Sequence, residues 1–391
     1  MTSLMLPEAG RKLRRFTLSQ PKSFGAGPHV AFDRVAYSAA HVVADPLAAA
    51  DPWIDCAIDW DATIAYRRRL WSLGLGVAEA MDTAQRGMGL DWRTSYELIR
   101  RTLDAARGEQ GALVACGCGT DHLPAGASSI HEVIAAYEMQ MEAIESLGGR
   151  LILMASRALA ACAQSPDDYA RVYDRLLSQA REPVIVHWLG EMFDPALAGY
   201  WGHRNADAAM DVAVEILNRN ARHVDGVKIS LLDKSKEVAM RRRLAPGIRM
   251  YTGDDFHFAD LIEGDEHGHS DALLGIFDAI APAASAALSA LAQGDVERFH
   301  EILGPTVPLS RHIFAAPTRF YKTGIVFMAW LNGHQDHFVM VGGQQSARSA
   351  LHLAQLFRLA DAAGLLEDPS LAAARMASWL ATQGVDAALA P

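Results

Sequence analysis

A chain of 391 residues is longer than one ordinary hydrophobic core requires, so we expect two domains or one (β/α)₈ barrel of ~250 residues with additions. Half of the residues are apolar and 21% are charged, which excludes a disordered, collagen-like or disulfide-scaffold protein. The 36 basic and 46 acidic residues leave a net charge of −10, which argues against a nucleic-acid partner.

Cysteine usage and hydropathy both indicate a cytoplasmic protein without a membrane partner. The four cysteines do not form a disulfide framework, and Cys116 and Cys118 lack the C-x-x-C spacing of redox and zinc motifs. The longest apolar tract, 280–292, is shorter than the ~20 residues that a membrane span requires. The basic residues at 11–15 are not followed by the apolar stretch of a signal peptide.

Short apolar runs alternate with segments of helical periodicity along the chain, a pattern typical of a parallel α/β fold. Eight strands are predicted, over 34–43, 76–81, 111–116, 150–155, 183–188, 225–231, 248–252 and 272–276. Helices are predicted over 92–107, 129–147, 167–180, 206–220 and 346–363. The first strand-to-helix turn has no G-x-G-x-x-G motif, so the sequence gives no support for dinucleotide binding. We therefore expect an N-terminal extension at 1–33, a (β/α)₈ TIM barrel at 34–282 and a C-terminal helical region at 283–391.

The sixth predicted strand carries a lysine on its inward face. Side chains alternate along a strand, so Val227 and Ile229 face the outer helices while Lys228 and Ser230 face the barrel interior. Burial lowers the pKa of an ammonium group, and a lysine with a lowered pKa forms imines with carbonyl substrates. A lysine that reaches the barrel mouth or pairs with a carboxylate is the structural alternative.

The seventh predicted strand ends in Thr252-Gly253-Asp254-Asp255, which suits a loop at the barrel mouth, where barrel enzymes place their sites. A turn with a capping aspartate is the alternative.

These two segments, in this order, resemble the dihydrodipicolinate synthase / N-acetylneuraminate lyase superfamily of Schiff-base (β/α)₈ lyases. Residues 226–230 match its G-[IV]-K-x-[AS] context around the imine-forming lysine, and 252–255 match its S-G-D-D loop. More loosely, 183–188 resemble its fifth strand, 272–276 its eighth, and 315–322 its N-P-x-P-x-K segment. The resemblance spans residues 35–366. It implies that Lys228 forms the imine, that no cofactor is needed, and that the chain assembles as a homodimer or homotetramer.

The segments that would bind substrate depart from this family. The family's G-T-T-G-E-type loop is replaced by residues 79–87, where Thr83 remains and Asp82 and Arg86 are new. Residues 154–158 lack the family's proton-relay tyrosine and contain Ser156 and Arg157. His187 and Trp188 replace a tyrosine and an asparagine on strand five. The chain is therefore identified as a divergent branch of the superfamily.

From these departures we assign expected roles. His187 is expected to be the general acid/base, with a pKa near neutrality, or else a hydrogen-bonded histidine of the barrel rim. Substrate-binding roles are expected for seven residues: Asp82, Thr83, Ser156, Arg157, Gly253, Asp254 and Asp255. Arg157 or Arg86 would pair with a carboxylate.

The chain is thus expected to be a class I aldolase or lyase that acts on a small-molecule 2-oxo acid or keto sugar through an imine on Lys228. A metal-dependent sugar isomerase or hydrolase is one alternative. It would draw its ligands from acidic, histidine and cysteine residues near strand ends: Cys116, Cys118, Asp121, His122, His187, Asp254, Asp255, His257, Glu263, Asp265, Glu266, His267 and His269. A barrel that binds a keto acid or sugar without turnover is the other alternative.

Overall fold

The computed structural model describes residues 2–24, 31–124 and 129–386. Eight parallel strands close into a barrel in the order β10-β3-β4-β5-β6-β7-β8-β9. They are β3 (Ala36–Ala39), β4 (Gly76–Glu79), β5 (Val114–Cys118), β6 (Arg150–Leu153), β7 (Val184–Leu189), β8 (Val224–Ser230), β9 (Arg249–Thr252) and β10 (Asp271–Leu274). Each overlaps a predicted strand, so the predicted (β/α)₈ fold is confirmed.

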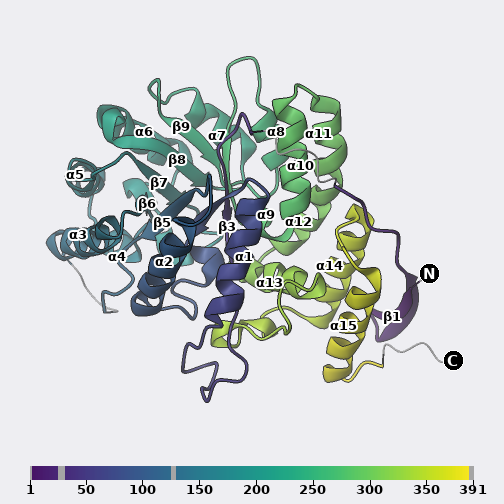
Figure 1. Ribbon diagram of the computed structural model, residues 1–391. Coiled ribbons are helices and arrows are strands. Elements are labelled where there is room, and N and C mark those ends of the chain that lie inside the picture. The colour runs from purple at the N-terminus through teal and green to yellow at the C-terminus, as the bar shows by residue number, and fades with distance from the viewer. Residues whose placement is uncertain (1, 25–30, 125–128, 387–391) are drawn as a thin grey trace.

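Helices surround the barrel on its outer face (Figure 1). They are α1 (Trp60–Ser72), α2 (Trp92–Ala106), α3 (Ile130–Ser146), α4 (Arg157–Cys162), α5 (Pro166–Leu177), α6 (Ala206–Arg219), α7 (Lys234–Arg241), α8 (Phe258–Glu263), α9 (Ile276–Ala279) and α10 (Ala281–Ala292). Their starts follow local chemistry. Before α3, for example, the Ser129 hydroxyl accepts from the Glu132 amide, and the Glu132 carboxylate accepts from the Ser129 amide.

The barrel strands are buried on both faces and separate two layers of apolar side chains. The inner layer fills the lumen with Tyr37, Ala39, Ala78, Met81, Ala115, Ile152, Ile185, Tyr251 and Leu273. On β8, Val227 and Ile229 belong to the outer layer, which packs against the helices. The residues between and beyond them, Lys228 and Ser230, are therefore inward-facing, as their alternation predicts.

The C-terminal helices pack beside the last helices of the barrel, and the last two of them lie next to the N-terminal segment (Figure 1). They are α11 (Val296–Leu303), α12 (Val307–Ile313), α13 (Tyr321–Leu331), α14 (Ala350–Ala363) and α15 (Pro369–Thr382). The N-terminal extension contains a hairpin of antiparallel strands, β1 (Ser3–Glu8) and β2 (Lys12–Thr17), which contacts α14 and α15. The sequence did not reveal this hairpin, because β2 is almost wholly exposed and has no alternating pattern. Residues 25–30 of the extension lie outside the described ranges.

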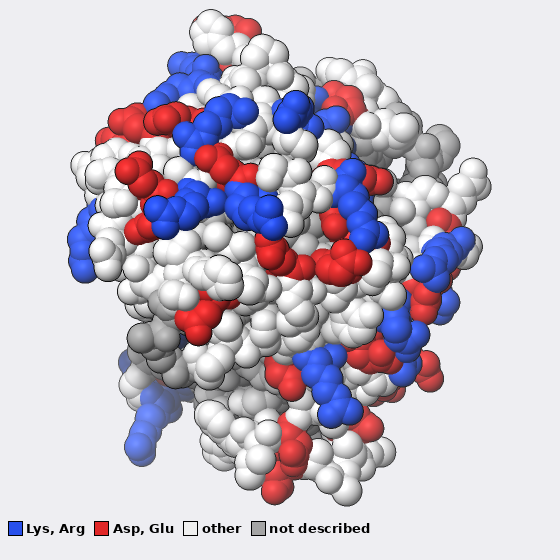
Figure 2. All heavy atoms as spheres, turned by 90° about the vertical axis from the view of Figure 1, so that its left-hand side faces the viewer, with Lys and Arg blue, Asp and Glu red and all other residues white. Residues whose placement is uncertain are grey.

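In the described part of the chain, no helix combines the length and the apolar character needed to cross a membrane. Acidic and basic side chains lie interleaved on the face of the molecule in Figure 2. Ion pairs also join neighbouring helices around the barrel, such as Arg175 of α5 and Glu138 of α3 at 2.8 Å. This face therefore offers no basic surface of the kind that binds nucleic acid.

Candidate active site

Lys228 occupies the interior of the barrel, flanked on neighbouring strands by His187 and Tyr251. Only 7% of its surface is exposed. Within the described residues, no hydrogen bond or ion pair holds its ammonium group; other groups act on it only through burial and longer-range charge. A buried amine without a fixed partner is costly, and it is free to react.

The negative charges of two aspartates act on the Lys228 ammonium. Burial lowers the pKa of the Lys228 ammonium, and the charges of Asp82 and Asp255 partly offset that effect. Burial also raises the pKa of Asp255, against the opposing effects of the Ile276 amide and Lys228. The pKa values of lysine and aspartate therefore converge, which favours proton exchange between the two groups.

Gly253 permits the close approach of β9 to β8 beside the lysine. A Cβ atom at this position would lie 2.2 Å from Ser230 Oγ and 2.8 Å from Lys228 Cε. Any side chain here would displace the lysine, so Gly253 shapes the site by leaving room for it.

Asp254 and Asp255 are neighbours in sequence, but their carboxyl groups contact different parts of the structure. One oxygen of Asp254 accepts from the backbone amides of Phe256 and His257 at 2.8 and 3.0 Å, and the other faces the His257 ring at 2.9 Å. These contacts fit a role in shaping the loop rather than in contacting substrate. Asp255 Oδ1 accepts from the Ile276 amide at 3.0 Å, and its charge acts on Lys228.

A cavity of about 590 Å³ opens at the carboxyl ends of β4 to β7. This volume suits a small-molecule ligand. Five of the residues with expected roles line it: Asp82, Arg86, Ser156, Arg157 and His187. The others are absent from its described lining: Lys228, Thr83, Gly253, Asp254 and Asp255. The sequence therefore identified groups that the fold brings to one cavity.

His187 is fully enclosed at the base of this cavity. Its Nε2 lies 3.3 Å from Ser230 Oγ in a hydrogen bond. Burial, with the nearby charge of Lys228, lowers the pKa of the imidazole well below its usual range. The expectation of a pKa near neutrality is therefore wrong, because the sequence does not reveal how completely the ring is desolvated. The imidazole is neutral at physiological pH.

The hydroxyl of Ser156 caps helix α4 and also lines the cavity. It accepts from the Leu159 amide at 3.0 Å and lies 2.6 Å from Thr120 Oγ1. Thr120 lines the cavity too and was not identified from the sequence.

The two arginines of the cavity differ in burial and in how many partners their guanidinium groups have. Arg86 is buried, and its guanidinium donates to Asp121, Gln140 and the Gly117 carbonyl. It is therefore not available to bind a substrate carboxylate. Arg157 pairs with Asp194 at the rim, and 51% of its side chain is exposed.

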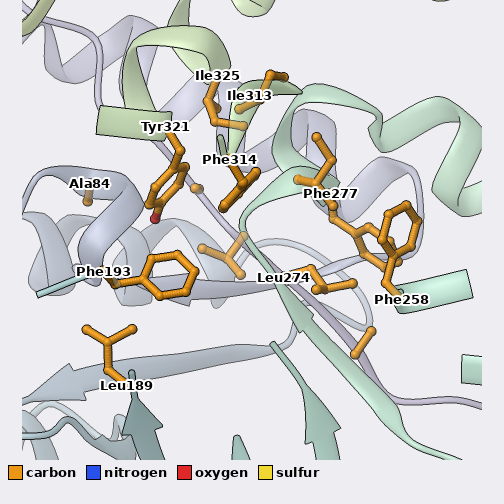
Figure 3. Close-up of a cluster of buried hydrophobic side chains, with 14 of the residues drawn as sticks. Ala84, Leu189, Phe193, Phe258, Leu274, Phe277, Ile313, Phe314, Tyr321 and Ile325 are labelled. Carbon is orange, nitrogen blue, oxygen red and sulfur yellow. The ribbon is translucent and has the colours of Figure 1, made fainter. Parts of the chain in front are cut away.

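Thr83 meets a tyrosine from the C-terminal helices. Its Oγ1 lies 2.8 Å from the hydroxyl of Tyr321, the first residue of α13, and both residues are buried. Figure 3 shows the Tyr321 ring beside Phe314 and Phe193. The ring stacks on Phe314 at a centroid distance of 4.3 Å, which fixes the position of the hydroxyl.

Tyr321 is a neighbour of the candidate site that the sequence analysis missed. Asp82 and Asp255, which act on Lys228, also act on the Tyr321 hydroxyl, and burial raises its pKa well above the usual range. The available signal was its place in the 315–322 segment, which resembles a family motif.

Lys322 is a second buried lysine near the site. Burial lowers the pKa of its ammonium to about 8, and Asp82 acts on it in the opposite direction. Unlike Lys228, it has fixed partners: its Nζ lies 3.1 Å from the Arg319 carbonyl oxygen and 3.3 Å from Met88 Sδ.

A buried carboxyl group supports the loop of β9 from behind. Glu237 accepts hydrogen bonds from Thr252 at 2.9 Å and Ser270 at 2.7 Å, and burial raises its pKa from 4.5 to about 8. Between these two pH values the folded chain keeps a proton that the unfolded chain releases. The free energy of unfolding therefore falls as the pH rises through this window, by about 1.4 kcal/mol over each tenfold drop in proton concentration.

We expect Glu237→Gln to remove this pH-dependent loss of stability, because the amide has the size of the protonated carboxyl group and cannot ionise. Relative to the unmodified protein, the variant should gain thermal stability at pH 8 and gain little at pH 4.5. Thermal unfolding at both pH values measures the difference. Glu215→Gln, at an exposed position of α6, is the matched control. An equal difference at both pH values would contradict the raised pKa.

The candidate metal ligands are not gathered into one site. Within residues 2–24, 31–124 and 129–386, no group of three or more histidine, cysteine or acidic side chains is arranged to hold a metal ion. His122 bonds to Gln140, and Asp265 pairs with Arg241. The ligand set on which the metal alternative rests is therefore not assembled.

Comparison with known proteins agrees with this architecture. The sequence model of a family described as "Protein of unknown function (DUF993)" matches residues 4–385. A sequence search of curated proteins gave no match.

Solved structures of the dihydrodipicolinate synthase family share the fold. The synthase from Aquifex aeolicus has a TM-score of 0.62 at 12% identity, covering 85% of this chain and 99% of that one. YagE, a family member from E. coli K12 solved in complex with pyruvate, has a TM-score of 0.65 at 14% identity over 85% and 99%. A monomeric dihydrodipicolinate synthase variant has a TM-score of 0.58 at 14% identity over 88% and 100%.

Proposed function

The chain belongs to the DUF993 family, and from this premise and the geometry of its barrel we propose that it is a Schiff-base lyase or aldolase. Its substrate would be a 2-oxo acid or a keto sugar that forms an imine with Lys228. The fold it shares with the dihydrodipicolinate synthase family supports this class of chemistry. We also propose a homodimer or homotetramer, although one structural neighbour is a monomeric variant.

The observation that carries the proposal is the state of Lys228. Its amine is desolvated, has no fixed partner among the described residues, and experiences the charges of two carboxylates. Desolvation favours the neutral, nucleophilic amine. The carboxylates would stabilise the positive charge of an iminium ion once it forms.

Imine formation needs a proton to leave the amine and later reach oxygen. Asp255 would take the proton from the Lys228 ammonium, whose neutral Nζ then attacks the carbonyl carbon. The new C–N bond forms as the carbonyl oxygen receives a proton from nitrogen. Asp255 returns its proton to that oxygen, which leaves as water, and the iminium remains.

The iminium then accepts the electrons of a bond at the neighbouring carbon. In cleavage, the C–C bond pair moves towards the iminium and produces an enamine, while the hydroxyl of the departing fragment loses its proton and becomes a carbonyl. His187 lines the cavity and would accept that proton. Because burial lowers its pKa, the protonated ring is a strong acid and would pass the proton on to the enamine. The Thr83–Tyr321 pair would hold a substrate oxygen. Protonation of the enamine and addition of water release the second product and the amine.

We expect His187→Ala to slow this proton transfer by ~10²–10⁴, the usual contribution of a general acid/base, while leaving the imine trappable. Exchange of substrate hydrogens for solvent deuterium, followed by NMR, reports enamine formation even before the physiological substrate is known. An unchanged exchange rate in a folded variant would indicate that His187 is a structural histidine.

The test of the proposed function is borohydride trapping. Hydride from borohydride adds to the iminium carbon, so the protein gains the mass of the carbonyl compound less one oxygen atom. A gain in mass that disappears in Lys228→Ala supports the proposal. The absence of any adduct at Lys228, with carbonyl compounds of both classes, would contradict it.

A further inference from the structure

The charges of the cavity are paired except at one position. Arg86 is matched by Asp121 at 2.6 Å, and its other nitrogens are occupied by Gln140 and a backbone carbonyl. Arg157 is matched by Asp194 at the rim. Of the charged residues that line the cavity in the described chain, Asp82 is the one without an ion-pair partner.

Two carboxyl groups act electrostatically on the amine that would attack the carbonyl. Asp82 follows β4 and Asp255 follows β9, and the charges of both act on Lys228 and on the buried Tyr321 hydroxyl. The substituents of a carbonyl carbon bonded to Lys228 would therefore be exposed to the charges of Asp82 and Asp255. Asp82 also acts on Lys322, but the Lys322 ammonium is held by the Arg319 carbonyl at 3.1 Å and Met88 Sδ at 3.3 Å and is not free to bind a substrate carboxylate.

A 2-oxo acid carries a carboxylate directly on its carbonyl carbon. In this site that group would add a negative charge next to the Asp82 carboxylate and the Asp255 carboxyl, and the described lining has no unpaired guanidinium to receive it. Like charges brought together in a water-poor site are strongly disfavoured. A hydroxymethyl group in the same place could instead donate a hydrogen bond to the Asp82 carboxylate, and such a charge-assisted bond is strong.

We propose that the site selects an uncharged hydroxy-ketone or keto sugar, with the hydroxyl beside the carbonyl bound by Asp82, and discriminates against 2-oxo acids. This inference rests on the proposed Schiff-base function and specifies its substrate class. The remaining lining fits it, since Thr120 and Ser156 present hydroxyls and His187 a neutral imidazole to further sugar hydroxyls.

A matched pair of small ketones isolates the discriminating group. Hydroxyacetone and pyruvate share the methyl ketone and differ in carrying a hydroxymethyl group or a carboxylate. We expect borohydride trapping of hydroxyacetone at Lys228 to exceed that of pyruvate by at least ~10²-fold at equal concentration, since polar mismatch in a buried site discriminates strongly. Glycolaldehyde and glyoxylate provide a second pair with the same difference.

Asp82→Asn removes the negative charge but keeps the size of the side chain, so the hydroxyacetone preference should fall at least tenfold. Asp211→Asn, a surface carboxylate paired with Arg243, is the control and should leave the preference unchanged. Pyruvate trapped at Lys228 as readily as hydroxyacetone would overturn this inference and leave the Schiff-base function standing. No adduct at Lys228 with any of the four compounds would contradict the proposed function itself.

Discussion

Replacing Lys228 by alanine is expected to abolish both the borohydride-dependent gain in mass and the solvent deuterium exchange of a bound ketone. Thermal stability should stay equal or rise, because removal of a buried amine relieves its desolvation, offset by a small cavity. The two carboxylates left behind do not reverse this, since Asp255 has a raised pKa and can take up a proton. Deuterium exchange, intact mass and thermal unfolding measure the three outcomes.

Lys228→Arg should fail in the same assays, because a guanidinium stays protonated and cannot act as a nucleophile. Lys322→Ala is the companion variant, since it removes the other buried lysine near Asp82 and should leave the Lys228 adduct in place. If Lys228→Ala keeps full exchange activity, the imine mechanism is wrong. If the imine forms in the unmodified protein but no carbonyl compound turns over, the chain is a binding barrel rather than an enzyme.

Asp255→Asn is expected to lower the exchange rate by ~10²–10⁴, because it removes the proton acceptor for the Lys228 ammonium. The unmodified protein should lose activity on the acid side at a pH above the ordinary aspartate pKa of about 4, since burial raises the pKa of Asp255 and its basic form is lost below that value. The variant should lack this acid limb. Rates of deuterium exchange across the pH range measure both effects.

The adjacent Asp254 is the matched comparison for this experiment. Because its carboxylate accepts from two backbone amides, Asp254→Asn is expected to act mainly on thermal stability, and much less on the exchange rate. Equal losses of exchange in the two variants would contradict the separate roles assigned to these neighbours.

The barrel and the inward lysine could be predicted from the sequence because both depend on short-range periodicity. Eight apolar runs separated by helical segments predicted the strands, and alternation on β8 separated Lys228 from Val227 and Ile229. The role expected for His187 came instead from the residue that it replaces on strand five, and the structure places it on β7 beside Lys228.

What the sequence could not reveal depends on contacts between distant segments. Tyr321 reaches Thr83 across 238 positions, and no local pattern predicts that pairing. The engagement of Arg86 by Asp121 and Gln140 likewise requires the folded arrangement of the loops. The pKa of His187 depends on complete burial, which a strand pattern alone does not give.

The central claim is that Lys228, rather than any other lysine, forms a covalent imine. Peptide mapping of the unmodified protein after borohydride trapping with hydroxyacetone tests it most directly, because Lys322 is also buried with a lowered pKa and is the natural competitor. The account predicts one modified peptide, carrying the added mass on Lys228. Modification on Lys322 alone, or no modification of Lys228 with any carbonyl compound tested, would contradict it.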